Sequence, residues 1–198
     1  MNRIALKVLL CVASLSVVPA ADASVIHFTA LLSGANESPT NSSQGTGVAF
    51  VDIDTLLNTM VVSATFSGLT GNTTVSHIHC CTTIPDAGTA NVATTTPSFP
   101  GFPLGVTSGT YLRTFDLTLA SSYNPAFVTA SGGTVAAAEA ALLAGMVGER
   151  TYFNIHTSVF PAGEIRGFLR AVPEPWTLGL IGAGGIGAWL GRRRRVPA

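Results

Sequence analysis

The sequence predicts an all-β protein: an antiparallel β-sandwich of about seven to eight strands with one short connecting helix, plus an N-terminal signal helix and a C-terminal membrane helix. Three observations lead to this prediction. Hydrophobic residues make up 47% of the 198 residues and charged residues only 10%, well below the typical charged fraction of about 25%. The middle of the chain is rich in Thr, Ser, Val and Phe, which favours strands. Both ends combine an uncharged apolar run with basic residues, as targeting segments do.

Residues 1–23 have the features of a secretory signal peptide. Arg3 and Lys7 supply a basic region, and residues 8–18 form an apolar run without charge. Ala21-Asp22-Ala23 follows with the small-x-small pattern that signal peptidase cuts. We therefore expect signal peptidase to act on this end, with export to an oxidising compartment.

Residues 24–171 form the predicted β domain, which is long enough for one hydrophobic core. Short apolar or alternating runs recur between turn clusters. The predicted strands are Val25–Leu32, Gly47–Asp54, Met60–Phe66, Thr74–Cys80, Gly109–Leu119, Tyr152–Thr157 and Glu164–Arg170. A run of helix formers over Thr134–Ala144 predicts the connecting helix, with Thr134 as N-cap and Gly145 as the stop. Residues 82–108 are rich in Thr, Pro and Gly, and a loop of that length is usually functional or a packed cover.

Residues 172–198 form a three-part tail. Val172-Pro173-Glu174-Pro175 is followed by an uncharged apolar run, residues 176–190, and then by four consecutive arginines. As a helix the run reaches roughly 22 Å, short of a hydrocarbon core of about 30 Å. It therefore predicts a membrane helix for a thinned bilayer, with the arginines on the cytoplasmic side. Pro173 and Pro175 keep the preceding segment extended and open to a protease.

This tail resembles the PEP-CTERM sorting signal. The resemblance implies transient anchoring in the inner membrane through residues 176–190, followed by processing by an exosortase-type protease at Pro173, Glu174 and Pro175. It also implies export to the cell surface or the extracellular matrix. A C-terminal anchor that is never cut is the alternative.

Four blocks of the middle segment resemble a CHRD domain, the module first described in chordin. They are Phe28–Glu37, Phe66–Leu69, the His-x-His block Ser76–His79, and Tyr152–Thr157 leading into Pro161–Gly167. One departure is that Cys80-Cys81 follows the His-x-His block where the family has Gly-Pro. The resemblance implies an extracellular β-sandwich-like domain and indicates the class of the protein better than its activity.

The histidines of the domain suggest a metal site. His77 and His79 are two residues apart on one predicted strand, so their side chains and that of Cys81 are expected on one face. His156 lies on another predicted strand that a sandwich can bring close. Two or three imidazoles with a thiolate suit copper or zinc.

Structural roles are the alternative for the same residues. The histidines would then bond to backbone groups or to Glu164 and Asp86, and the protein would hold no cofactor. Cys80 and Cys81 leave three outcomes open: a disulfide between these neighbours, bridges to another chain, or thiolates on a metal. Glu164 and Arg166 are predicted to form a surface ion pair of little energetic weight.

Charge excludes several classes of function. Residues 24–171 hold four arginines and eight acidic residues, a net charge of 4 − 8 = −4, which argues against nucleic-acid binding. Lys7 is the chain's only lysine, so lysine-based catalysis is excluded from the domain.

The leading expectation is an exported, non-enzymatic module that binds surface proteins or exopolysaccharide at the cell surface or in the matrix. The alternative is a copper- or zinc-binding or redox protein of superoxide-dismutase-like type that uses His77, His79, His156 and Cys81.

Overall fold

The computed structural model describes residues 25–173. The predicted signal peptide, Glu174, Pro175 and the predicted membrane helix over residues 176–190 lie outside the described residues. Within residues 25–173, no helix is long and apolar enough to cross a membrane.

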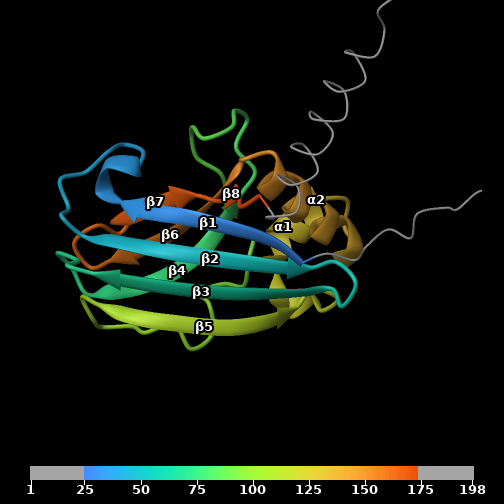
Figure 1. The fold of residues 1–198 in the computed structure, drawn as a ribbon, viewed down its shortest axis with the longest axis horizontal. Helices are drawn as coiled ribbons and strands as arrows, with labels where there is room; N and C mark the ends of the chain where they lie inside the picture. Colours follow the sequence, from blue (N-terminus) through green and yellow to red (C-terminus); the bar gives the residue numbers. More distant parts are fainter. Residues whose placement is uncertain (1–24, 174–198) are drawn as a thin grey trace, which may run out of the picture.

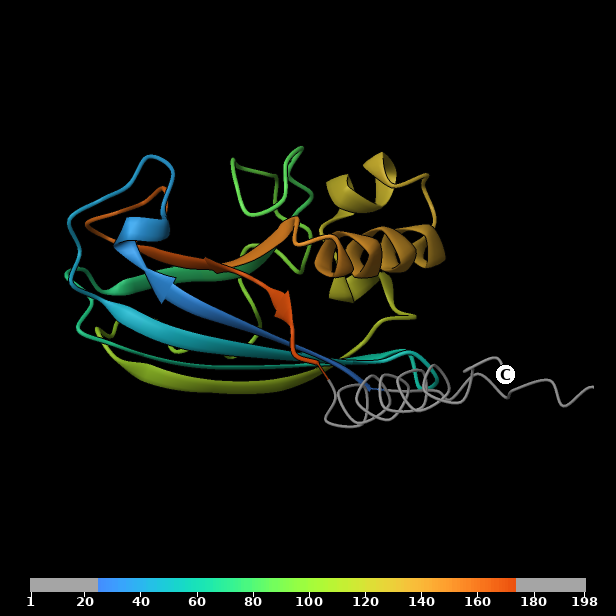
Figure 2. The same ribbon diagram turned by 45° about the horizontal axis from the view of Figure 1, so that its top comes forward.

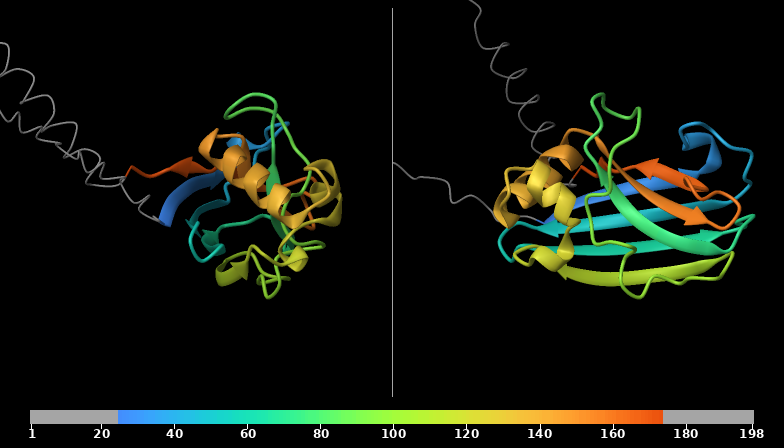
Figure 3. Two further views of the ribbon diagram at one scale, coloured as in Figure 1. Left: turned by 90° about the vertical axis from the view of Figure 1, so that its right-hand side faces the viewer. Right: turned by 180° about the vertical axis from the view of Figure 1, so that it is seen from behind.

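Eight strands form one antiparallel sheet in the order β4-β6-β7-β1-β2-β3-β5, with β8 pairing with β1 (Figure 1). They are β1 (Val25–Ser33), β2 (Thr46–Asp54), β3 (Thr59–Ser67), β4 (Thr73–Cys80), β5 (Gly109–Asp116), β6 (Thr151–Thr157), β7 (Ile165–Phe168) and β8 (Arg170–Ala171). The prediction of an antiparallel β domain with seven to eight strands is confirmed. The sheet curls into a half-barrel, so the two layers expected of a sandwich are continuous with one another (Figure 3).

Two α-helices lie together at one end of the sheet (Figure 1). They are α1 (Pro125–Ala130) and α2 (Val135–Val147), and two short 3-10 helices, η1 (Gly34–Asn36) and η2 (Ala120–Ser122), complete the helical elements of the described chain. The Thr134 hydroxyl accepts a hydrogen bond from the Ala137 N–H at 3.2 Å, which confirms the predicted N-cap.

The prediction that Gly145 ends this helix is wrong, because α2 continues to Val147. Gly145 is instead a packing position. A Cβ added there would lie 2.5 Å from the sulfur of Cys80 and 2.6 Å from that of Cys81, so only glycine lets the helix approach these sulfurs.

The core lies inside the curl and is built from the alternate apolar residues of the strands. The long loop closes its open side, since the Phe99 ring packs 5.8 Å from that of Phe153 on β6 and 5.4 Å from that of Phe115 on β5. Phe99 and Phe102 are both buried, so this part of residues 82–108 is a packed cover.

The outer face of the sheet is divided into an open half and a covered half. Over β1, β2 and β5 it is open, with Leu31, Phe50 and Leu112 exposed by 75%, 48% and 74%. Over β4, β6 and β7 it is covered by loops from residues 34–45, 82–98 and 158–164, which rise above the sheet in Figure 2. The polar residues of the covered half are therefore buried.

A candidate metal site on the covered face of the sheet

Three of the predicted site residues meet on the covered face. His77 and His79 come from β4, and His156 comes from the neighbouring strand β6. Their ring centroids lie 5.5–5.9 Å apart. One ring nitrogen of each histidine lies within 4.8 Å of those of the other two. We call these three residues the histidine cluster.

Backbone carbonyls hold the outer nitrogen of each ring. His77 Nε2 bonds to the carbonyl of Pro97, His79 Nδ1 to that of Ala90 at 2.9 Å, and His156 Nδ1 to that of Pro161 at 2.9 Å. A carbonyl oxygen only accepts hydrogen bonds, so each of these ring nitrogens is the N–H donor. In a neutral imidazole the other nitrogen then carries a lone pair.

The other nitrogen of each ring has no such bond. His77 Nδ1, His79 Nε2 and His156 Nε2 are buried and have no hydrogen-bond partner in the described residues. A buried acceptor without a partner costs about 1–3 kcal/mol, and native proteins contain few of them. Three in one cluster are the arrangement expected of a metal site, in which each lone pair binds the ion.

The protonation state of the histidine cluster is also suited to metal binding. Burial lowers the pKa of His79 to about 4, and burial also lowers the pKa values of His77 and His156. The rings are therefore neutral near pH 7, and their lone pairs are available to a metal.

Cys81 does not belong to the histidine cluster. β4 ends at Cys80, and the two sulfurs of Cys80 and Cys81 form a disulfide. The Cys81 sulfur lies 3.6 Å from the Ala141 carbonyl of α2, away from the histidines. The expectation that Cys81 shares the face of His77 and His79 is wrong because the strand does not continue through it. Of the three outcomes left open for the two cysteines, the structure contains the disulfide between neighbours.

A model of the CHRD domain matches residues 28–169, more than half of the chain. The chain belongs to the CHRD domain family. A second model, the PEP-CTERM protein-sorting motif, matches residues 171–195, so both resemblances expected from the sequence are confirmed. This motif is recognised by exosortase, a membrane protease, and marks the protein for export and sorting to the cell surface. No curated protein and no solved structure matches the chain.

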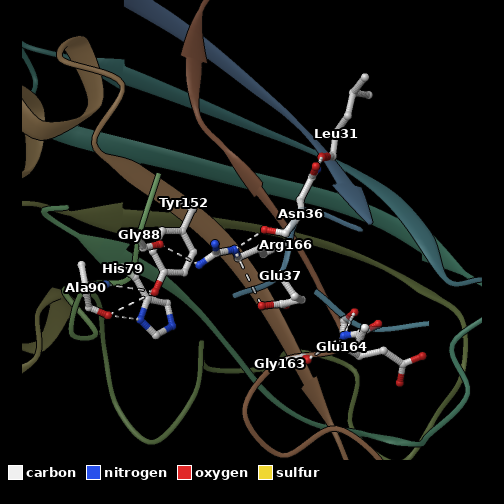
Figure 4. Close-up of polar contacts among 11 residues, drawn as sticks. Leu31, Asn36, Glu37, His79, Gly88, Ala90, Tyr152, Gly163, Glu164 and Arg166 are labelled. Carbon is white, nitrogen blue, oxygen red and sulfur yellow. Dashed lines mark hydrogen bonds and ion pairs between the residues drawn. The ribbon is translucent and has the colours of Figure 1, made fainter. Parts of the chain in front are cut away.

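A tyrosine of the CHRD domain supports one of the imidazoles. The Tyr152 ring stacks on that of His79, with centroids 4.7 Å apart and planes 7° apart. Its hydroxyl donates to the Ala90 carbonyl at 3.1 Å and accepts from the Ala90 N–H at 3.2 Å. The same carbonyl accepts from His79, as Figure 4 shows, so Tyr152 and Ala90 together fix the plane of that ring.

Arg166 is a buried cation beside this arrangement. Its guanidinium lies 4.6 Å from the Tyr152 ring centroid and donates to the carbonyls of Asn36 and Gly88. Its Nε lies 3.7 Å from Oε2 of Glu37, and both side chains are buried (Figure 4). Burial raises the pKa of Glu37 to about 7, although Arg166 acts in the opposite direction.

The predicted surface ion pair between Glu164 and Arg166 is wrong, because the two residues are only 0% and 4% exposed and have different partners. Burial alone would raise the pKa of Glu164, but four donors lower it instead. They are the hydroxyls of Ser43 and Thr157 and the N–H groups of Thr70 and Gly71. This carboxylate joins three loops and is not a partner of the histidines.

Buried polar residues surround the histidine cluster on the covered face, and we call them the buried polar layer. The sequence did not predict that Glu37, Tyr152 and Asn154 belong to it. Tyr152 and Asn154 alternate with His156 on β6, so the strand period alone places them on its face. Glu37 gave no such signal, because it lies in a loop that only the folded chain brings to Arg166.

Beside this layer lies a pocket of about 480 Å³ on the outer face of β1, β7 and β8. Its lining includes Leu31, Asn36, Asp86, Arg166, Phe168 and Arg170. Asp86, considered above as a partner for the histidines, instead forms an ion pair with Arg170 at 2.7 Å.

Proposed function

We propose that this exported protein binds one copper or zinc ion in its CHRD domain, through His77, His79 and His156. The observation that carries the proposal is a cluster of three histidines with ligand atoms within 4.8 Å of one another, each with a buried ring nitrogen that has no partner in the described residues. Metal-binding histidines in proteins donate their other N–H to a carbonyl or carboxylate, and each of these rings does so.

The separation of the nitrogens is compatible with a bound ion after a small closure. Nitrogen–metal distances of about 2.0–2.1 Å put three trigonal ligands about 3.5 Å apart. The nitrogens lie within 4.8 Å of one another, so each ring needs to move inward by less than about 1 Å. His156 is the least buried of the three and provides the way in for the ion.

Metal analysis of the full chain, purified without chelator, tests this proposal. We expect about one equivalent of copper or zinc per chain, lost in the double variant His77→Ala/His79→Ala and in His156→Ala. The partly exposed His156 makes the single variant the one better able to fold, which circular dichroism checks.

His27→Ala is the matched control, since His27 lies outside the histidine cluster and contacts Asp52 at 2.7 Å. The control should keep the full equivalent of metal. Folded wild-type protein that takes up neither copper nor zinc, even when both are supplied, would refute the proposal and favour purely structural histidines.

Polysaccharide binding is a second candidate function, favoured by the pocket on β1, β7 and β8. Charged groups of Arg170 and Asp86 lie there beside the apolar side chains of Leu31 and Phe168, a combination that suits the hydroxyls and C–H faces of a sugar. Titration with extracellular polysaccharide fragments should show at least about tenfold weaker binding for Arg170→Ala. Arg113→Ala, on the distant strand β5, is the control, and equal affinities for all three proteins would contradict this role.

A further inference from the structure

The ligand set of the histidine cluster carries no negative charge. Within residues 25–173, the group of facing donors consists of the three histidines alone, without a carboxylate or a thiolate. An imidazole that keeps its N–H on the carbonyl of Pro97, Ala90 or Pro161 and binds an ion through its other nitrogen is neutral. A bound ion would therefore keep its full charge inside the protein.

The charged groups around the cluster do not compensate for that charge. The Arg166 guanidinium lies 4.6 Å from the centroid of the Tyr152 ring, which itself stacks on the His79 ring with centroids 4.7 Å apart. Glu37 faces Arg166, and its pKa of about 7 leaves it only partly ionised at neutral pH. Glu164 is held by its own four donors.

The cost of burying an ion without counter-charges rises with the square of its charge. A divalent ion in this position meets that cost in full and is also repelled by Arg166 twice as strongly as a monovalent ion. A zinc ion held by three histidines takes a water as its fourth ligand, whereas the three unbonded ring nitrogens of this cluster are buried.

We infer that the histidine cluster selects copper in its monovalent state, held by three neutral imidazoles beside a fixed arginine cation. This inference rests on the proposed function and narrows it from copper or zinc to Cu(I). It is based on the charge balance of the site: three neutral ligands, no anionic ligand among the described residues, and Arg166 as the neighbouring cation.

Competition for each ion tests the inference. The full chain is titrated anaerobically with Cu(I) against a chromophoric Cu(I) chelator, and separately with Zn(II) and Cu(II) against chelators of known affinity. An effective burial penalty of several kcal/mol per additional charge predicts Cu(I) affinity above Zn(II) affinity by at least about a thousandfold. His27→Ala should bind all three ions as the wild type does.

Two charge variants probe the cause of the selectivity. Arg166→Gln removes the cation and should narrow the preference for Cu(I) over Zn(II) by at least about tenfold, whereas Arg166→Lys should largely keep it. Glu37→Gln removes the carboxylate beside Arg166 and should widen the preference. Because Arg166 is buried, the Glu37 variant supplies the readout if Arg166→Gln does not fold.

The outcomes separate this inference from the proposed function. Zn(II) or Cu(II) bound at the cluster as tightly as Cu(I) would overturn the selectivity and leave the metal site in place. Binding of no ion by folded protein would overturn both. An unchanged preference in both charge variants would exclude Arg166 as its cause and overturn the stated mechanism.

Discussion

The hydrogen bonds of single residues define what the histidine cluster is able to bind. Each imidazole donates one N–H to a carbonyl of a covering loop, which leaves the lone pair of its other nitrogen available. Hydrogen bonding of this kind alone would be structural, but it satisfies only one nitrogen per ring. The inward nitrogens, without partners in the described residues, are the feature that a structural role does not explain.

These histidines give the metal-free protein a definite dependence on pH. Burial lowers the pKa of His79 from 6.5 to about 4, so between these values the unfolded chain binds more protons than the folded one. The stability contributed by neutral His79 is then complete above about pH 6.5. It is lost as the pH falls toward 4, by up to about 1.4 kcal/mol per pH unit for one histidine. Urea unfolding of chelator-treated protein over this range measures the slope. Because Glu37 opposes this slope, the deciding series is run in Glu37→Gln, where stability that is independent of pH would contradict neutral buried imidazoles.

Glu37 affects the pH dependence of stability in the direction opposite to that of His79. Burial raises its pKa from 4.5 to about 7, so the stability it contributes is complete below pH 4.5 and is lost as the pH rises to 7. In Glu37→Gln this opposing slope disappears, and stability should rise more steeply with pH than in the wild type between pH 5 and 7. The same urea series, run on both proteins, compares the two slopes. Parallel slopes would show that Glu37 is ionised throughout.

At the scale of elements, the histidine cluster depends on the strand β4, which lies at an edge of the sheet and is covered by a loop. β4 is an edge strand, and residues 91–94 of the long loop bond along its free side, with Ala93 N–H to Ile78 O and Cys80 N–H to Asn91 O. The strand period was enough to predict that His77 and His79 share a face. It did not reveal that loops bury that face, because the loops are placed by long-range contacts such as those of Phe99.

The ends of elements were harder to predict than their existence. All seven predicted strands are present, since apolar alternation reports directly on a sheet with one buried face. β5 ends at Asp116 and not at Leu119, and α1 was not foreseen. Glycine is common at helix ends, so Gly145 was predicted to end the helix. In the structure it lies inside α2, where it packs against the disulfide.

Packing of α2 on the disulfide provides a prediction for stability. Gly145→Ala puts a methyl group against the sulfurs of Cys80 and Cys81 and should lower the free energy of unfolding by about 1–3 kcal/mol. Ala144→Ser, on the exposed side of the same helix, should stay within about 0.5 kcal/mol. Urea unfolding at constant pH measures both changes, and equal stability of the two variants would contradict the packing described for α2.

At the scale of the whole molecule, the two ends of the CHRD domain lie side by side. Phe28 of β1 pairs with Ala171 of β8, and the Val172 N–H donates to the His27 carbonyl at 2.8 Å. Sorting by the PEP-CTERM motif therefore acts on a segment that directly follows a paired strand. Removal of residues beyond this pairing leaves every described strand intact.

Processing at both ends is testable on protein collected from outside the cell. Intact mass spectrometry should show a chain that begins near Ser24 and ends near Pro173. Trp176 and Trp189 are the only tryptophans of the chain, so the processed form should show tyrosine fluorescence alone. External protein that retains the arginine tail would contradict cleavage.

The claim that three inward-facing imidazoles bind a metal is tested most directly by anomalous diffraction from crystals of the copper-loaded protein. We expect one copper ion at about 2.0 Å from His77 Nδ1, His79 Nε2 and His156 Nε2, with the carbonyl bonds of the other ring nitrogens retained. Copper bound at a different place, or an anomalous map without a peak between the three rings, would contradict it.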